Sequence, residues 1–243
     1  MLPINQEERP SRLQGDCERC FGLCCVSLPF AKSVDFAMDK DAGQPCANLR
    51  PDFRCGIHTE LRDRGFRGCT VYDCFGAGQY MSQVTYGGRD WRQASTENAA
   101  EMFQAFPVMH QLFELLAYLQ EVLALPEAGP VHGAARSLLE ETERLTRLAP
   151  EGLLRLDIAT HRGAVGTLLL QASELSRAEA GRRFDAEARE VARGASSGSA
   201  GGRDGRSSSG AGDRSAAGAG SESAGSSMSG RGNSSDGRRQ RCR

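Results

Sequence analysis

Cysteines are the residues of this chain best suited to chemistry: it has nine, and eight lie within one short N-terminal segment. The eight candidate metal ligands are Cys17, Cys20, Cys24, Cys25, Cys46, Cys55, Cys69 and Cys74. Cys17 and Cys20 are separated by two residues, so one tight turn can present both sulfurs to a single ion. We therefore interpret this pair as the strongest metal signal in the sequence.

The number of metal ions is left open by the spacing. Four thiolates complete one structural zinc site or one iron–sulfur cluster, and eight allow two mononuclear sites, a shared cluster, or four ligands with four bystanders. Cys24 and Cys25 are adjacent, and we expect their side chains to diverge. Soft sulfur ligands argue against magnesium and calcium. We expect zinc as the cofactor, with iron or an iron–sulfur cluster as alternatives.

Two further residues near this chemistry have simple interpretations. His58 follows Cys55 by three residues and could replace one sulfur, but we interpret it as an exposed loop histidine. Cys242 lies in a basic run at the end of the chain, without nearby partners in the sequence, and we interpret it as incidental.

Composition limits the partners and the cellular location that we expect for this cysteine cluster. Thirty basic residues against 31 acidic ones give a net charge of −1, so no nucleic-acid partner is indicated. The first 16 residues lack the apolar core of a secretory signal, and no stretch of 18 apolar residues follows, so we expect no membrane partner. We expect a cytoplasmic location, where clustered cysteines bind metal or do redox chemistry more often than they form disulfides.

The sequence predicts a mainly α fold: a small irregular Cys-rich metal-binding domain, then an antiparallel three-helix bundle and a disordered tail. The predicted segments are a flexible N-terminus at 1–16, the Cys-rich domain at 17–92, the helical bundle at 96–193 and a Gly/Ser/Arg-rich tail at 194–243. The tail has almost no apolar side chains to bury, so its composition cannot offset the entropy lost on folding.

Three helices are predicted in the second segment. The first begins with Asn98 as N-cap and Glu101 as its capping-box partner, and it contains Pro107. Its apolar stripe is Met102, Phe103, Phe106, Met109, Phe113, Leu116, Leu119 and Leu123. The second helix carries Val131 to Leu148, and the third begins at Pro150 and carries a stripe from Leu154 to Leu175.

These motifs together resemble a known family. The run Asp16-Cys17-Glu18-Arg19-Cys20-Phe21-Gly22-Leu23-Cys24-Cys25, with Phe53-Arg54-Cys55-Gly56-Ile57-His58 and Gly68-Cys69-Thr70-Val71-Tyr72-Asp73-Cys74, resembles the zinc- or iron-chelating cysteine-cluster family of bacterial proteins. With the helices to about Ala178, it looks like the N-terminal region of bacterial pentapeptide-repeat proteins. That resemblance implies a following β-helix of Ala-(Asp/Asn)-Leu-x-x units.

The repeats themselves are absent here, because no such unit occurs after Ser176. Either a genuine tail or an out-of-frame replacement of a repeat domain explains the change, and repeat-dependent binding cannot be transferred to this chain. The sequence favours a non-enzymatic metal-binding protein whose helical region serves as a scaffold or interaction surface for a protein partner. The alternatives are an iron–sulfur or thiol redox accessory protein and a protein-interaction adaptor.

Overall fold

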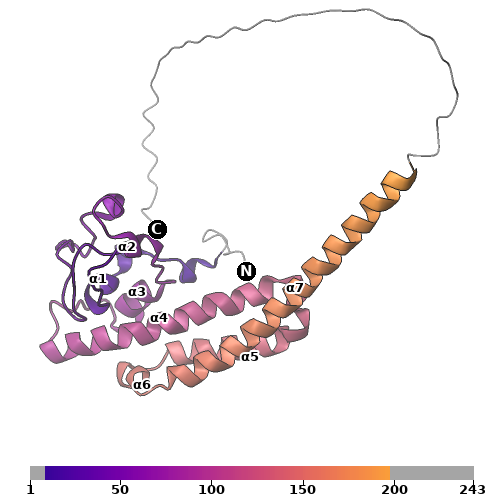
Figure 1. The fold of residues 1–243 in the computed structure, drawn as a ribbon. Coiled ribbons are helices and arrows are strands. Elements are labelled where there is room, and N and C mark those ends of the chain that lie inside the picture. The colour runs from indigo at the N-terminus through magenta and orange to yellow at the C-terminus, as the bar shows by residue number, and fades with distance from the viewer. Residues whose placement is uncertain (1–8, 198–243) are drawn as a thin grey trace, which may run out of the picture. The chain divides into compact units, whose positions relative to one another are not determined.

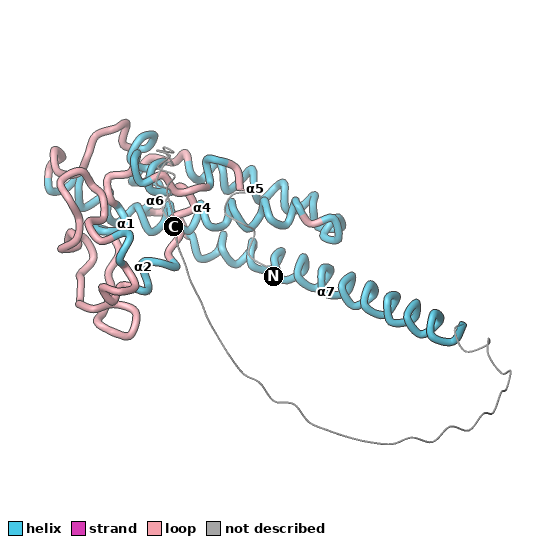
Figure 2. Tube along the Cα trace, turned by 90° about the horizontal axis from the view of Figure 1, so that it is seen from above, coloured by secondary structure: helices cyan, strands magenta, loops and turns pink. Residues whose placement is uncertain are grey.

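The structure is a computed structural model that describes residues 9–197. Those residues are mainly helical and contain two isolated β-bridges but no strand, which confirms the prediction of a mainly α protein (Figure 1). The α-helices are α1 (Leu23–Ser27), α2 (Arg67–Val71), α3 (Ala77–Tyr80), α4 (Thr96–Ala124), α5 (His132–Thr146), α6 (Pro150–Leu154) and α7 (Ile158–Ser197). Long loops and short turns connect α1, α2 and α3, as Figure 2 shows.

Chain contacts divide the molecule into two units, the first reaching Gly181 and the second starting at Arg182 within α7. The predicted Cys-rich segment and most of the predicted helical segment belong to the first unit. From residue 198 onward, the predicted tail at 194–243 lies outside the described residues. Within residues 9–197, no helix is both long enough and apolar enough to cross a membrane.

The longest helix of the first unit, α4, starts earlier than predicted. Its N-cap is Ser95, whose Oγ accepts a hydrogen bond from the backbone N–H of Asn98 at 3.3 Å. The predicted N-cap, Asn98, is therefore already inside the helix. The prediction was wrong because both Ser and Asn are good caps, and the sequence offered two starting points three residues apart.

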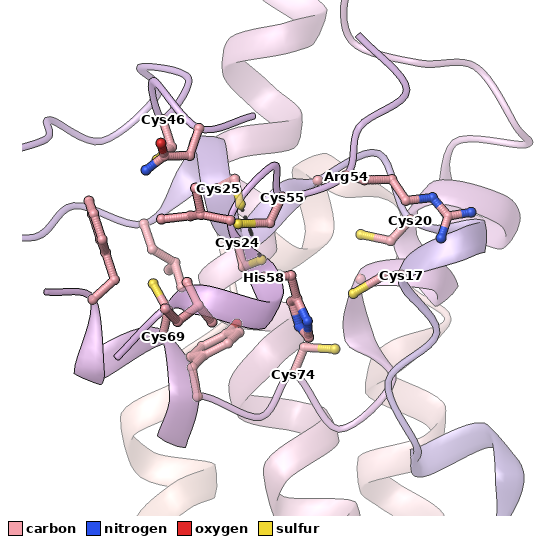
Figure 3. A pocket seen from close by; sticks show the side chains of 18 of the residues that line it. Cys17, Cys20, Cys24, Cys25, Cys46, Arg54, Cys55, His58, Cys69 and Cys74 are labelled. Atoms are coloured by element: carbon pink, nitrogen blue, oxygen red, sulfur yellow. Dashed lines mark hydrogen bonds between the residues drawn. The ribbon is translucent and has the colours of Figure 1, made fainter. Parts of the chain in front are cut away.

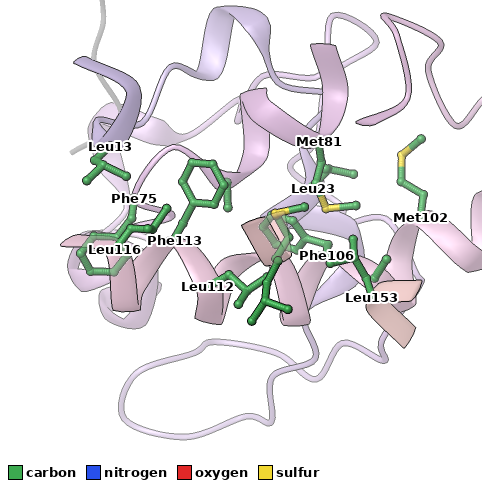
Figure 4. Packing of buried hydrophobic residues seen from close by; sticks show 14 of the residues in the cluster. Leu13, Leu23, Phe75, Met81, Met102, Phe106, Leu112, Phe113, Leu116 and Leu153 are labelled. Atoms are coloured by element: carbon green, nitrogen blue, oxygen red, sulfur yellow. The ribbon is translucent and has the colours of Figure 1, made fainter. Parts of the chain in front are cut away.

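A first apolar cluster joins the Cys-rich segment to the helices (Figure 4). Met102, Phe106, Met109 and Leu112 of α4 are fully buried in it. Its other buried members are Leu13, Leu23, Val26, Phe75, Ala77, Met81, Ala105, Phe113, Leu116, Ala117, Leu145 and Leu153. Residues on both sides of the predicted boundary thus form one core, and Leu13 anchors the segment before Cys17.

A second apolar cluster joins α4, α5 and the first part of α7. Its buried members are Leu115, Leu119, Val122, Ala128, Ala135, Val165, Leu168 and Ala172. The start of α5 lies near the end of α4 in this cluster, whereas Leu145 at the end of α5 packs near the start of α4 in the first cluster. The two helices therefore run antiparallel.

The predicted third helix is interrupted. Pro150 occupies the first turn of α6, as predicted, but α6 ends at Leu154 and a new helix, α7, begins at Ile158. Asp157 supports this second start, because its carboxylate accepts hydrogen bonds from the backbone N–H and the hydroxyl of Thr160. Leu154 is exposed rather than part of the apolar stripe that was predicted to start there.

Candidate metal centre

All eight N-terminal cysteines line one cavity of about 430 Å³ (Figure 3). They come from separate short elements: the turn at Cys17–Arg19 with Cys20, helix α1, two loop segments, helix α2, and the turn that leads into α3. Each cysteine is half-buried, because its side chain borders the cavity rather than the packed core. The fold therefore gathers sulfurs that are up to 57 positions apart in sequence, counting from 17 to 74.

Helix α1 presents two of these cysteines after a turn that only glycine fits. Gly22 precedes the helix with φ +66°, a left-handed conformation that a side chain disfavours. A Cβ there would also stand 2.8 Å from a Leu49 methyl carbon and 3.0 Å from the carbonyl oxygen of Phe53. The glycine thus lets the loop around Leu49 close over α1.

The two cysteines of α1 lie closer together than predicted. The Sγ atoms of Cys24 and Cys25 are 4.0 Å apart. Sulfurs bound to one tetrahedral zinc ion at 2.3 Å are about 3.8 Å apart, so this separation allows the pair to bind one ion or two neighbouring ions. The expectation that the side chains diverge was wrong, because rotation about Cα–Cβ brings the sulfurs together despite the separate directions of the Cα–Cβ bonds.

Backbone hydrogen bonds hold the loop cysteines beside α1. The N–H of Cys46 donates to the carbonyl of Cys25 at 2.9 Å. Leu49 and Cys55 form an isolated antiparallel bridge, and the N–H of Gly56 donates to the carbonyl of Asn48 at 2.7 Å. Cys46 and Cys55 are thereby carried to the same wall of the cavity.

Cys74 sits at the start of the turn that leads into α3. Gly76 adopts φ +90°, and a Cβ at Gly78 would approach the Sγ of Cys20 to 2.7 Å. The N–H groups of Gly76 and Gly78 hydrogen-bond the sulfur of Cys74 and oppose the rise in its pKa that burial causes. This glycine-rich turn therefore leaves room for two sulfurs and directs backbone donors at one of them.

Without a metal, burial keeps most of these sulfurs protonated. It raises the pKa of Cys20 to about 12 and that of Cys69 to about 11, and it raises the pKa of Cys55 as well. Cys25 is the exception, because a hydrogen bond from Cys24 and the nearby charge of Lys40 lower its pKa. Metal binding to this cavity would consequently release protons.

A buried lysine lies beside Cys46 and the two cysteines of α1. Lys40 is only 7% exposed, and its ammonium donates to the carbonyls of Val26, Asp41 and Gln44 at 2.9–3.1 Å. It also lies 5.6 Å from the ring centre of Phe30. Sequence reasoning missed this residue, since nothing in the spacing of a single lysine indicates that it will be buried beside sulfurs.

Tyr72 contributes a polar group without a partner. Its side chain lines the cavity, and its buried hydroxyl has no hydrogen-bond partner. Burial raises the pKa of this phenol above its ordinary value, and the neighbouring Cys24 and Cys74 raise it further. A buried hydroxyl normally pairs with an acceptor, so this one is a donor available to a charged sulfur.

The four histidines divide into one cavity residue and three structural residues, of which His132 lies with its ring nitrogen 3.0–3.1 Å from the carbonyls of Val122 and Leu125. His58 is half-buried and lines the cavity, so its interpretation as an exposed loop residue was wrong. His110 Nε2 lies 2.9 Å from the carbonyl oxygen of Asp73, and its ring stacks on Tyr72. His161 lies 2.9 Å from Thr142 Oγ1 in the helical region.

The donor set suits a soft metal, although no ligand shell is closed. Within residues 9–197, no group of three or more His, Cys, Asp and Glu side chains is already arranged to hold a metal ion. The chemistry of the donors nevertheless fits zinc or iron: the cavity offers sulfur, a histidine, backbone N–H donors and an unpaired hydroxyl. Cys17 is disulfide-bonded, and the other seven cysteines of the cavity are free thiols.

Comparison with known proteins finds one curated relative that is itself uncharacterized. The chain is 55% identical over 168 residues to the uncharacterized protein YybG of Bacillus subtilis (strain 168). The match covers 69% of this chain and 60% of YybG, so the chain spans about three fifths of that relative's length. No family model matches the chain, and no solved structure matches it.

Proposed function

We propose that this chain is a non-enzymatic metal-binding protein of the cysteine-cluster type, with zinc as its ion. The observation that carries this proposal is the single cavity lined by all eight N-terminal cysteines. Eight sulfurs scattered through an apolar core would have argued against it. The sequence resemblance to zinc- or iron-chelating cysteine-cluster proteins, and to the N-terminal region of pentapeptide-repeat proteins, points in the same direction.

The ligands in this proposal are Cys17, Cys20, Cys24, Cys25, Cys46, Cys55, Cys69 and Cys74. Participation of Cys17 requires reduction of its disulfide, which a cytoplasmic location would favour. A bound ion would supply the stabilisation that loops 28–66 lack, because few of their side chains are buried. The helices α4, α5 and α7 then serve as a three-helix scaffold behind the metal region.

Elemental analysis tests the proposal most directly. Protein purified without an affinity tag, under reducing and anaerobic conditions, should contain zinc at one or more equivalents per chain. A Cys20→Ser/Cys74→Ser variant should contain less, whereas Cys242→Ser should match the wild-type protein. Metal-free wild-type protein that binds neither zinc nor iron on addition would refute the proposal.

A redox function is the second candidate, and the pKa of Cys25 favours it. A lowered thiol pKa next to a second sulfur is typical of reactive cysteines. A disulfide between Cys24 and Cys25 is disfavoured, however, since neighbouring Cα atoms are about 3.8 Å apart and disulfides need at least about 4.4 Å. Redox chemistry would therefore rely on an iron–sulfur cluster, which a brown anaerobic preparation would reveal.

An adaptor function is the third candidate, and exposed apolar residues on α7 favour it. Phe184 is 71% exposed and Val191 is 73% exposed. They are seven positions apart, so they lie on nearly the same face of the helix. A Phe184→Asp/Val191→Asp variant would lose a partner that binds this face while keeping the metal content of the wild-type protein.

A further inference from the structure

We infer that the cavity holds two divalent metal ions in two separate sulfur groups. The Cys20 group consists of Cys20, Cys24 and Cys74, and the Cys69 group consists of Cys25, Cys46, Cys55 and Cys69. This inference rests on the proposed metal-binding function and deepens it, because the spacing of the cysteines left the number of sites open.

Proximity of the sulfurs divides them in this way. A Cβ at Gly78 would lie 2.7 Å from the Sγ of Cys20 and 3.9 Å from the Sγ of Cys74, so these two sulfurs are neighbours, and Cys24 lies near both. Cys46 is held beside Cys25 by the hydrogen bond from its N–H to the Cys25 carbonyl at 2.9 Å, and Cys55 and Cys69 lie near the same two residues. Figure 3 shows the same division, with Cys20 and Cys74 on one side of the cavity and Cys46 and Cys69 on the other.

The adjacent cysteines of α1 belong to different groups. Cys24 lies near Cys20 and Cys74, whereas Cys25 lies near Cys55 and Cys69. Their sulfurs are nevertheless only 4.0 Å apart, so the two groups are neighbours rather than remote sites. One helical turn thus provides a ligand to each ion.

Lys40 gives independent support for an anionic site at the Cys69 group. Within the described part of the chain, this buried ammonium forms no ion pair with a carboxylate. The charged groups that face it are Cys46, Cys25 and Cys24, together with the exposed Asp41. A buried cation needs a compensating anion. Four thiolates around a divalent ion carry a net charge of −2, which is the compensation that neutral thiols do not give.

Tyr72 gives the corresponding support at the Cys20 group. Its buried, unpaired hydroxyl lies near Cys24, Cys74 and Cys20. A metal-bound thiolate accepts hydrogen bonds that a neutral thiol accepts only weakly, so a charged sulfur would satisfy this donor. The N–H groups of Gly76 and Gly78 at Cys74 add two donors to the same group.

The fourth ligand of the Cys20 group comes from Cys17 or His58. Both residues line the cavity. Zinc accepts either a fourth sulfur or a histidine nitrogen in a tetrahedral site. The two possibilities differ in the absorption of bound cobalt, since each cobalt–thiolate bond contributes charge-transfer intensity.

Cobalt titration of the full chain, reduced and kept anaerobic, tests the two-site inference. Native mass spectrometry should show two Co²⁺ ions per wild-type chain, and added Zn²⁺ should displace both. Cys74→Ser should lose one ion and Cys69→Ser should lose the other, so the double variant should bind none. Cys242→Ser, which changes none of the eight cysteines assigned to the cavity, should keep two.

Two gentler variants test each group without removing a ligand. Tyr72→Phe should weaken the binding of the ion in the Cys20 group, and Lys40→Met should weaken the binding of the ion in the Cys69 group. Each affinity should fall by roughly 10- to 100-fold, as expected for groups that act on a metal ligand. Lys40→Arg should restore most of the affinity. In the metal-free protein, Tyr72→Phe should leave the thermal midpoint unchanged or raise it, because the deleted hydroxyl has no partner there.

The outcomes separate failure of this inference from failure of the proposed function. A chain that binds one ion, which either single cysteine variant abolishes, would show a single shared site. Uptake of iron with sulfide as one cluster spanning both groups would also overturn the inference. No metal binding at all would instead overturn the proposed function. If neither Cys17→Ser nor His58→Ala weakens the binding of an ion, the assignment of the Cys20 group is wrong.

Discussion

The Cys-rich segment and the helical segment are stabilised by different means. The helices α4, α5 and α7 bury Leu, Val and Ala side chains in a cluster of their own. The cysteine loops bury few large side chains and contact the helices mainly through Leu13, Leu23, Val26 and Phe75. Apolar burial suffices for long helices, whereas short loops around a cavity need another source of stability.

The largest effect that separates the two regions should follow metal removal. A structural ion contributes on the order of 10 kcal/mol to folding, so chelation should expose the backbone of residues 17–75 to fast hydrogen exchange. Exchange should also quicken at Met102 to Phe113, because this part of α4 packs on the cysteine segment. The second apolar cluster should stay protected, and circular dichroism should keep most of the helical signal.

Replacing Cys17 and Cys20 with Ser should reproduce part of the effect of the chelator, since a hydroxyl is a poor ligand for a soft metal and the Cys69 group keeps its own ligands. The matched control, also measured under reducing conditions, is Cys242→Ser, whose exchange pattern should equal that of the wild-type protein. If both regions stay protected without metal, the site is not structural, and the redox function gains support.

Phe106→Ala tests the shared core and should cost about 3–5 kcal/mol. Phe106 is fully buried and also lines the cavity, so both the thermal midpoint and the zinc affinity should fall. Leu119→Ala is the control, because Leu119 is equally buried but belongs to the second cluster. It should lower the midpoint through a loss of about 2–5 kcal/mol and leave zinc affinity unchanged. Equal losses of zinc affinity in both variants would contradict the division into a first cluster that supports the cavity and a second cluster that does not.

A pair of glycine substitutions should have opposite signs in the two regions. Gly78→Ala places a Cβ 2.7 Å from the Sγ of Cys20 and should cost about 1–3 kcal/mol through overpacking, with weaker zinc binding. Gly163→Ala, in α7, meets nothing within 4 Å and should stabilise the protein by about 0.5–1 kcal/mol. Chemical denaturation and cobalt binding of both variants measure this contrast. An increase in stability for Gly78→Ala would show that the turn tolerates a side chain.

The smallest effect should be a pH dependence of the free energy of unfolding that arises in the helical region. Burial lowers the pKa of His161, while the nearby Glu141 opposes that shift. The unfolded chain therefore binds its proton first as the pH falls below about 6.5. The stability that the neutral imidazole contributes is present above that pH and is lost as the pH falls toward the lower folded pKa.

Urea unfolding of the metal-free protein between pH 8 and pH 5 measures this effect. His161→Gln should show a smaller decline in the free energy of unfolding than the wild-type protein. Metal-free protein is needed because protons also compete with metal for the cysteine sulfurs. Identical declines in the two proteins would mean that His161 keeps its ordinary pKa on folding.

The sequence by itself determined the mainly helical fold and the set of candidate ligands. Apolar periodicity located α4 and α5, because each helix must bury one face, and Pro150 marked the start of α6. Cysteine type and clustering identified the same eight residues that line the cavity, since the soft chemistry of sulfur is a property of each residue alone. Local signals were weaker where two residues competed for one role, as Ser95 and Asn98 did at the N-cap.

Only the tertiary structure decided how the ligands are grouped and what surrounds them. The 4.0 Å between the sulfurs of Cys24 and Cys25, the burial of Lys40 and the unpaired hydroxyl of Tyr72 depend on loops that meet from distant positions. Sequence spacing limits how far apart two sulfurs can be, but it does not state which loops close on which helix. That choice depends on the shared core, where Leu13, Leu23 and Phe75 pack on α4 and fix the walls of the cavity.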